Sequence, residues 1–202
     1  MLAVCALASP ITQLHAPHSC SGLQLIHLAG TNETGIGIVG ALLSSAIASA
    51  VPGTTTYSVS YDDTVTVDEG ASMAIEYLEA QASRCPDQKF VLSGYSKGAI
   101  VIHSTKLSNE IQAKIFSILV FGDPLRNTNP SWPSPWPKTW PINTPKVNLA
   151  PRDGRTTAQN IGDPVCEAGG TNGNAHVAYR TDGSAPAAAD FVKAQVQEGN
   201  EL

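Results

Sequence analysis

Short apolar runs alternate with helix-like segments along most of this chain. Most of the runs lack the alternation of apolar and polar residues that is typical of a sheet with one face in water. They predict strands at Leu23–Gly30, Thr54–Tyr61, Lys89–Ser93, Ile115–Phe121 and Pro145–Leu149. The segments between and after them predict helices at Ile36–Val51, Val67–Arg84, Ser96–Leu107 and Pro186–Val196. This order predicts an α/β fold in which helices flank a central parallel five-stranded sheet on both faces.

Length and composition limit the class of protein. The 202 residues favour one domain, which we place at residues 10–202. A hydrophobic share of 42% with only 14% charged residues argues against a disordered chain. The net charge is −5 and Lys and Arg form no cluster, so we expect no nucleic-acid partner. No stretch approaches the ~20 apolar residues of a membrane helix, so we expect no stable membrane insertion.

The first residues and the cysteines predict secretion. Residues 1–9 are apolar and small and contain Ala6-Leu7-Ala8, a pattern typical of signal-peptide cleavage sites, but they lack the basic start of such a peptide. We interpret them as a truncated signal peptide, the alternative being a hydrophobic N-terminus that stays on. The four cysteines are Cys5, Cys20, Cys85 and Cys166. A Cys20–Cys85 disulfide would tie the N-terminus to the sheet, which leaves Cys166 without an obvious partner.

One irregular segment, at about residues 127–151, is rich in proline and contains the tryptophans Trp132, Trp136 and Trp140. Proline excludes helix and central strand there. We interpret the segment as a surface loop held by its own aromatic rings, because tryptophan usually packs. The alternative is a substrate-facing rim.

The pentapeptide Gly94-Tyr95-Ser96-Lys97-Gly98 carries the strongest chemical signal. It follows a predicted apolar strand and opens a predicted helix, which is the setting of a nucleophile elbow. Glycines are needed on both sides because the turn is crowded. We therefore predict that Ser96 is a nucleophile, although a serine in this position can also be an ordinary helix cap.

A serine nucleophile needs a base and an acid that orients the base. Of the five histidines, His176 lies in a loop near the C-terminus, after the glycine-rich residues 169–174. A chain order of serine, acid and histidine places the base there. The acid must then lie between Ser96 and His176, and the candidates are Asp123, Asp153 and Asp163.

Four segments together resemble the fungal cutinase and acetylxylan esterase family. They are Ala29–Gly35, Cys85–Gly98, Gly162–Cys166 and His176–Tyr179, which match that family's oxyanion loop, nucleophile block, acid loop and histidine loop. The resemblance implies an α/β-hydrolase without a lid, extracellular action, disulfides, and hydrolysis of esters in plant polymers. It selects Asp163 as the acid, and it implies that the backbone N–H groups of Thr31 and Lys97 form the oxyanion hole. It requires no metal and no organic cofactor.

The chain departs from the family pattern in three places. Lys97 stands where the family commonly has glutamine, Gln159 stands where a cysteine partner for Cys166 is expected, and Leu149–Gln159 looks inserted. The acid loop is therefore expected to be unbridged and looser.

These residues predict a secreted, monomeric serine esterase of the cutinase type. The expected substrate is an ester of a plant polymer, cutin or acetylated xylan. One alternative is an acetylxylan esterase with a smaller acyl pocket. The other is a catalytically impaired hydrolase fold that binds surfaces, because small changes in the acid loop disrupt a triad.

Overall fold

The computed structural model describes residues 20–62, 64–125, 162–166 and 169–199. Its centre is a sheet in which all neighbouring strands are parallel, in the order β2-β1-β3-β4. The strands are β1 (Leu23–Leu28), β2 (Thr55–Ser58), β3 (Lys89–Tyr95) and β4 (Ile115–Phe121). The sheet thus places the carboxyl ends of β1, β3 and β4 along one edge.

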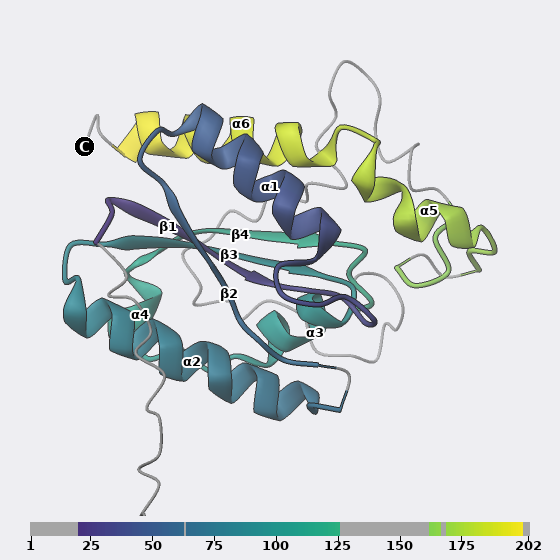
Figure 1. Ribbon diagram of the computed structural model, residues 1–202, viewed down its shortest axis with the longest axis horizontal. Coiled ribbons are helices and arrows are strands. Elements are labelled where there is room, and N and C mark those ends of the chain that lie inside the picture. Colours follow the sequence, from purple (N-terminus) through teal and green to yellow (C-terminus); the bar gives the residue numbers. More distant parts are fainter. Residues whose placement is uncertain (1–19, 63, 126–161, 167–168, 200–202) are drawn as a thin grey trace, which may run out of the picture.

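Helices cover both faces of this sheet (Figure 1). On one face lie α1 (Gly37–Ala50) and α6 (Ser184–Gly199), and on the other lie α2 (Val67–Arg84), α3 (Lys97–Ser104) and α4 (Asn109–Gln112). Two short elements, α5 (Gly173–Val177) and η2 (Ala178–Arg180), precede α6. The predicted α/β-hydrolase architecture, a parallel sheet between two helical layers, is therefore confirmed.

The strands β1, β3 and β4 each supply both cores. In β1, Ile26 and Leu28 belong to the core beneath α2 and α3, whereas Leu23 and Leu25 belong to the core beneath α1 and α6. This division follows from the period of two residues in a strand. Because both faces are buried, the strand is apolar except at Gln24 and His27.

The prediction of five strands is wrong for the described residues, which form four. The predicted strand Pro145–Leu149 lies outside the described residues, as do the proline- and tryptophan-rich loop and the predicted signal peptide. β2 is shorter than predicted because it is an edge strand with only half-buried side chains. The elements α4, α5 and η2 were not predicted, because helices this short have little periodicity to reveal them.

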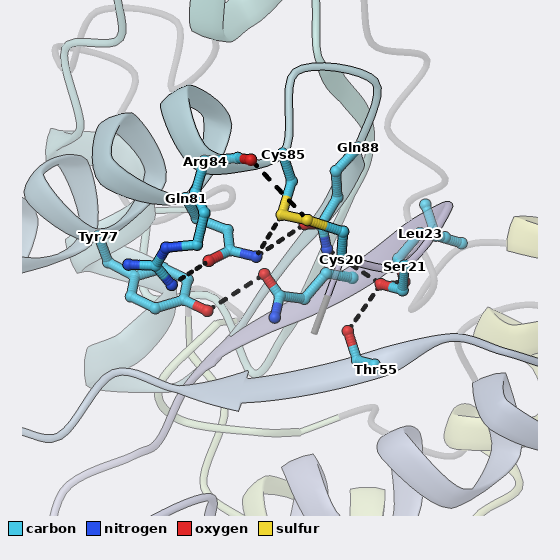
Figure 2. Close-up of a disulfide and its surroundings, with 10 residues drawn as sticks. Cys20, Ser21, Leu23, Thr55, Tyr77, Gln81, Arg84, Cys85 and Gln88 are labelled. Carbon is cyan, nitrogen blue, oxygen red and sulfur yellow. Dashed lines mark hydrogen bonds between the residues drawn. A yellow bond between two sulfur atoms is a disulfide. The ribbon is translucent and has the colours of Figure 1, made fainter. Parts of the chain in front are cut away.

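Cys20 and Cys85 form the predicted disulfide, with their Cα atoms 5.5 Å apart. The bridge joins the start of the described chain to the end of α2 (Figure 2). Around it runs a chain of side-chain hydrogen bonds, in which Gln81 donates to Gln88, Gln88 to Ser21, and Ser21 pairs with Thr55 of β2. Gln81 and Gln88 are buried, so these bonds satisfy amides that would otherwise destabilise the fold.

His27, in the middle of β1, is a fully buried titratable group. Its Nδ1 lies 3.0 Å from the Ser93 hydroxyl, and its Nε2 has no hydrogen-bond partner among the described residues. The ring packs against Gly40 of α1, where an added Cβ would lie only 2.2 Å from Cδ2. Burial lowers the pKa of His27 from 6.5 to about 3.

We expect His27 to make the fold sensitive to acid. Below pH 6.5 the unfolded chain takes up a proton at this residue and the folded chain does not, until the pH nears 3. The free energy of unfolding should therefore fall by up to ~1.4 kcal/mol per pH unit in this window. Urea denaturation from pH 7 to pH 4 should show a smaller decline for His27→Leu than for wild type.

Ser93→Ala is the matched control, because it removes the hydrogen-bond partner and keeps the imidazole. It should lower stability while retaining the pH dependence of the wild-type protein. Equal pH dependence in His27→Leu and wild type would contradict this account.

Candidate active site

The turn between β3 and α3 presents Ser96 at the carboxyl edge of the sheet. Ser96 has φ 52° and ψ −114°, a left-handed backbone that a non-glycine residue rarely adopts. The flanking glycines permit the turn: a Cβ on Gly94 would lie 2.4 Å from the Gly98 carbonyl oxygen, and a Cβ on Gly98 would lie 2.0 Å from that of Leu28. The strained serine backbone and the tight glycine contacts together match a nucleophile elbow.

The structure brings Ser96, His176 and Asp163 together. The Ser96 Oγ lies 3.0 Å from His176 Nε2, and His176 Nδ1 lies 2.9 Å from Asp163 Oδ2. A carboxylate only accepts hydrogen bonds, so Nδ1 carries the imidazole proton and Nε2 is free to accept the serine proton. The three side chains come from the β3–α3 turn, the helix α5 and the 162–166 loop, respectively.

The carboxylate of Asp163 is fully buried but well supplied with donors. Its Oδ1 accepts from the Val165 N–H at 2.8 Å, and its Oδ2 accepts from the Cys166 thiol at 3.1 Å as well as from His176. Burial by itself raises the pKa of Asp163, but the hydrogen bonds from His176, Val165 and Cys166 outweigh it and lower the pKa below its usual range. Asp163 is therefore ionised at neutral pH.

The glycine-rich segment before His176 fixes the acid loop to the histidine loop. The Asn172 N–H donates to the Gly162 carbonyl at 2.7 Å, and a Cβ on Gly170 would lie 2.6 Å from the Asp163 carbonyl oxygen. Asn172 also caps α5, the helix that carries His176. The close approach explains why this segment contains glycine.

His176 is held from two further sides. The Tyr95 hydroxyl donates to the His176 carbonyl at 2.8 Å, and the two rings stack with their centroids 5.2 Å apart. Burial raises the pKa of Tyr95 to about 12, which keeps this donor protonated. Gly122 lies against the imidazole on another side, where an added Cβ would be 2.7 Å from Cε1.

The residues predicted for the oxyanion hole flank the serine. Thr31 is exposed in the loop between β1 and α1, and Lys97 begins α3 directly after Ser96. Glu33 organises the first of these segments: its carboxylate accepts from the Gly30 N–H and the Ile38 N–H, each at 2.9 Å. It thereby caps α1, whose own N-cap residue, Ile36, makes no side-chain hydrogen bond.

The side chain of Lys97 points away from the serine. Its Nζ donates to the backbone carbonyls of Val65 at 2.8 Å and Asp62 at 3.2 Å, and it lies 5.3 Å from the centre of the Tyr61 ring. The Tyr61 hydroxyl in turn donates to the Ala29 carbonyl. The lysine thus ties the loop after β2 to the start of α3.

Sequence reasoning missed the supporting residues Glu33, Tyr95 and Tyr179, the last of which donates its hydroxyl to Asp163 Oδ2 at 3.5 Å. All three lie inside the family-like segments named from the sequence, and the uncapped start of α1 is a signal that points to Glu33. Asp123, an alternative acid, lies against His103 instead of His176, and Asp153 and Gln159 lie outside the described residues. Among the described residues, no group of His, Cys, Asp and Glu side chains is arranged to hold a metal ion, and no helix is long and apolar enough to cross a membrane.

Fold and site together define the class as a serine ester hydrolase with an α/β-hydrolase fold, and comparison with known proteins narrows it further. The profile of the cutinase family matches residues 19–196, so the chain belongs to the cutinase family. Cutinase CUT1 of Coprinopsis cinerea is 32% identical over 96% of this chain and 94% of its own length. Carboxylesterase Culp1 of Mycobacterium tuberculosis is 28% identical over 92% of this chain and 88% of its own.

Solved structures share the fold. The catalytic core of acetyl xylan esterase from Trichoderma reesei superposes with a TM-score of 0.67 at 18% identity, over 88% of this chain and 100% of that one. A cutinase from Trichoderma reesei in complex with a phosphonate inhibitor gives 0.63 at 23% identity, over 88% and 77%. At these identities the likeness concerns the fold alone.

We expect the Cys166 thiol to influence the charge on Asp163. Cys166→Ala removes one donor from the carboxylate, so negative charge concentrates on Oδ2 and favours a protonated His176. The acidic limb of the pH profile of kcat/KM should then move to higher pH by roughly half a unit. Cys166→Ser keeps a donor, and its limb should stay near that of wild type. Identical profiles for both variants and wild type would show that the thiol has no effect.

Proposed function

We propose that Ser96 is the nucleophile, His176 the general base and Asp163 the acid that orients the base. The observation that carries this proposal is the continuous hydrogen-bond chain from the Ser96 Oγ through both imidazole nitrogens to a buried, ionised carboxylate. A serine hydroxyl is a poor nucleophile at neutral pH, and a base within 3.0 Å is what activates it.

In this mechanism His176 takes the hydroxyl proton while Ser96 Oγ attacks the ester carbonyl carbon. The negative charge that develops on the carbonyl oxygen is stabilised by the backbone N–H groups of Thr31 and Lys97, each worth about 3 kcal/mol if aligned. His176 then protonates the leaving alcohol, and an acyl-serine remains. Water activated by the same imidazole hydrolyses it and releases the acid. Asp163 stabilises the imidazolium in both steps without taking its proton.

For the substrate we propose cutin-type polyesters and short to medium acyl esters. The support is the cutinase family assignment and the curated relatives that carry that name. Ser96 is half-buried at the carboxyl edge of the sheet, which suits an ester that is part of a polymer. Acetylxylan esterase is the alternative, because a small acyl pocket on the same fold would restrict the enzyme to acetate.

Hydrolysis of p-nitrophenyl esters from acetate to palmitate tests both the machinery and the acyl preference. We expect activity to peak at short to medium chains, and Ser96→Ala to lower kcat/KM by at least about 10⁴-fold. Activity confined to acetate would favour acetylxylan esterase. Activity in folded Ser96→Ala equal to wild type would refute the proposed nucleophile, and folded wild type no more active than that variant would favour the impaired surface-binding alternative.

We also propose that the protein is secreted. The Cys20–Cys85 disulfide supports this, because disulfides persist mainly in oxidising compartments. When the full chain is expressed in a secreting host, we expect the protein in the culture supernatant with the bridge intact. Mass spectrometry of the supernatant and the cells checks this, and recovery only in the cells with both thiols free would contradict it.

A further inference from the structure

A second buried histidine–aspartate pair lies beside the catalytic one. His103, in α3, has its Nε2 2.9 Å from Oδ2 of Asp123, which follows β4. Both side chains are only 3% exposed. The other carboxylate oxygen, Oδ1, accepts from the Leu125 N–H at 2.9 Å. The proposed reaction has no role for either residue, yet a buried polar pair is retained there at the cost of desolvation.

Residues 121–123, from the end of β4 to Asp123, contact both Ser96 and His176. The Phe121 carbonyl accepts from the Ser96 N–H at 2.9 Å, so the last residue of β4 holds the strained serine backbone. Gly122, with φ 52°, lies against the imidazole of His176, and an added Cβ would be 2.9 Å from Nδ1. A small displacement of residues 121–123 would therefore move the nucleophile and the base relative to each other.

His103 belongs to the helix that starts at the nucleophile. α3 runs from Lys97 to Ser104. The contact between His103 and Asp123 therefore completes a ring, which leads from Ser96 along α3 to His103, across to Asp123, and back through the end of β4 to Ser96. The paired residues of β3 and β4 end at Tyr95 and Phe121. Beyond that point, the side-chain contact between His103 and Asp123 links α3 to the chain after β4.

We propose that His103 and Asp123 are a positioning pair that fixes residues 121–123 beneath the serine and the imidazole. Neither side chain contacts the reacting atoms, so both act through Phe121 and Gly122. This inference rests on the proposed roles of Ser96 and His176. It also accounts for Asp123, which in sequence order was a candidate for the catalytic acid and in the structure is committed to a different histidine.

The pair predicts a specific kinetic pattern. His103→Leu and Asp123→Ala should each lower kcat by about 10- to 100-fold, since misplacement by an ångström costs rates of that order. KM should change by less than about twofold, because binding surfaces are not altered. The double variant should be no slower than the slower single variant, as expected for residues that act as a unit. His103→Gln keeps an N–H donor and should recover most of the activity.

The measurement is kcat per active site, with sites counted by covalent phosphonate labelling and folding checked by circular dichroism. His27→Leu is the matched control, a buried histidine whose loss should lower stability and leave kcat per site unchanged. The positioning role is refuted if the His103 and Asp123 variants have fewer labelled sites but the wild-type kcat per site. It is also refuted if the losses of the two single variants multiply in the double variant.

The Ser96→Ala variant separates this inference from the proposed function. If Ser96→Ala retains activity, the proposed nucleophile fails, and the positioning pair fails with it. If Ser96 is required and kcat survives the loss of the pair, the nucleophile stands and the positioning pair alone is refuted.

Discussion

The close contact between α3 and the end of β1 is the constraint on which the active site depends. Gly98 approaches the Leu28 carbonyl so closely that any side chain would displace the helix. This contact allows α3 to begin directly after β3 and forces Ser96 into a left-handed backbone. The strain is offset by the Ser96 N–H bond to Phe121 and by the packed strands beneath it. The position of Ser96, the proposed nucleophile, is therefore a property of the sheet and not of a flexible loop.

Two buried ionisable groups, Asp163 held ionised and His27 held neutral, give the protein the same response to acid. Asp163 is held ionised by its donors, so its contribution to stability is present above its usual pKa and is lost as the pH falls through the lowered value. His27 is held neutral, and acid favours its unfolded, protonated form. Both effects stabilise the fold at neutral pH over acidic pH. For Asp163 the cause is the set of hydrogen-bond donors, which outweighs burial, and for His27 the cause is burial itself.

The departures from the family pattern have structural consequences. Lys97 keeps its backbone position next to Ser96, and its ammonium group is used on the carbonyls of Asp62 and Val65 rather than on the site. Cys166 is buried without a disulfide, and its thiol donates to the carboxylate of Asp163. The described part of the acid loop is thus held by hydrogen bonds where the sequence alone indicated a looser segment.

The sequence by itself determined the α/β class, the nucleophile elbow and the bridge between Cys20 and Cys85. These follow from local pattern: apolar runs, glycine spacing, and cysteines beside elements that must pack. Choosing Asp163 over Asp123 from sequence required the family resemblance, since both follow Ser96 in the chain. Only the tertiary structure decided that Asp123 pairs with His103, that Glu33 caps α1 and that Gly122 supports His176. Such contacts join residues distant in sequence, and no periodicity or spacing encodes which side chains meet when separate elements pack.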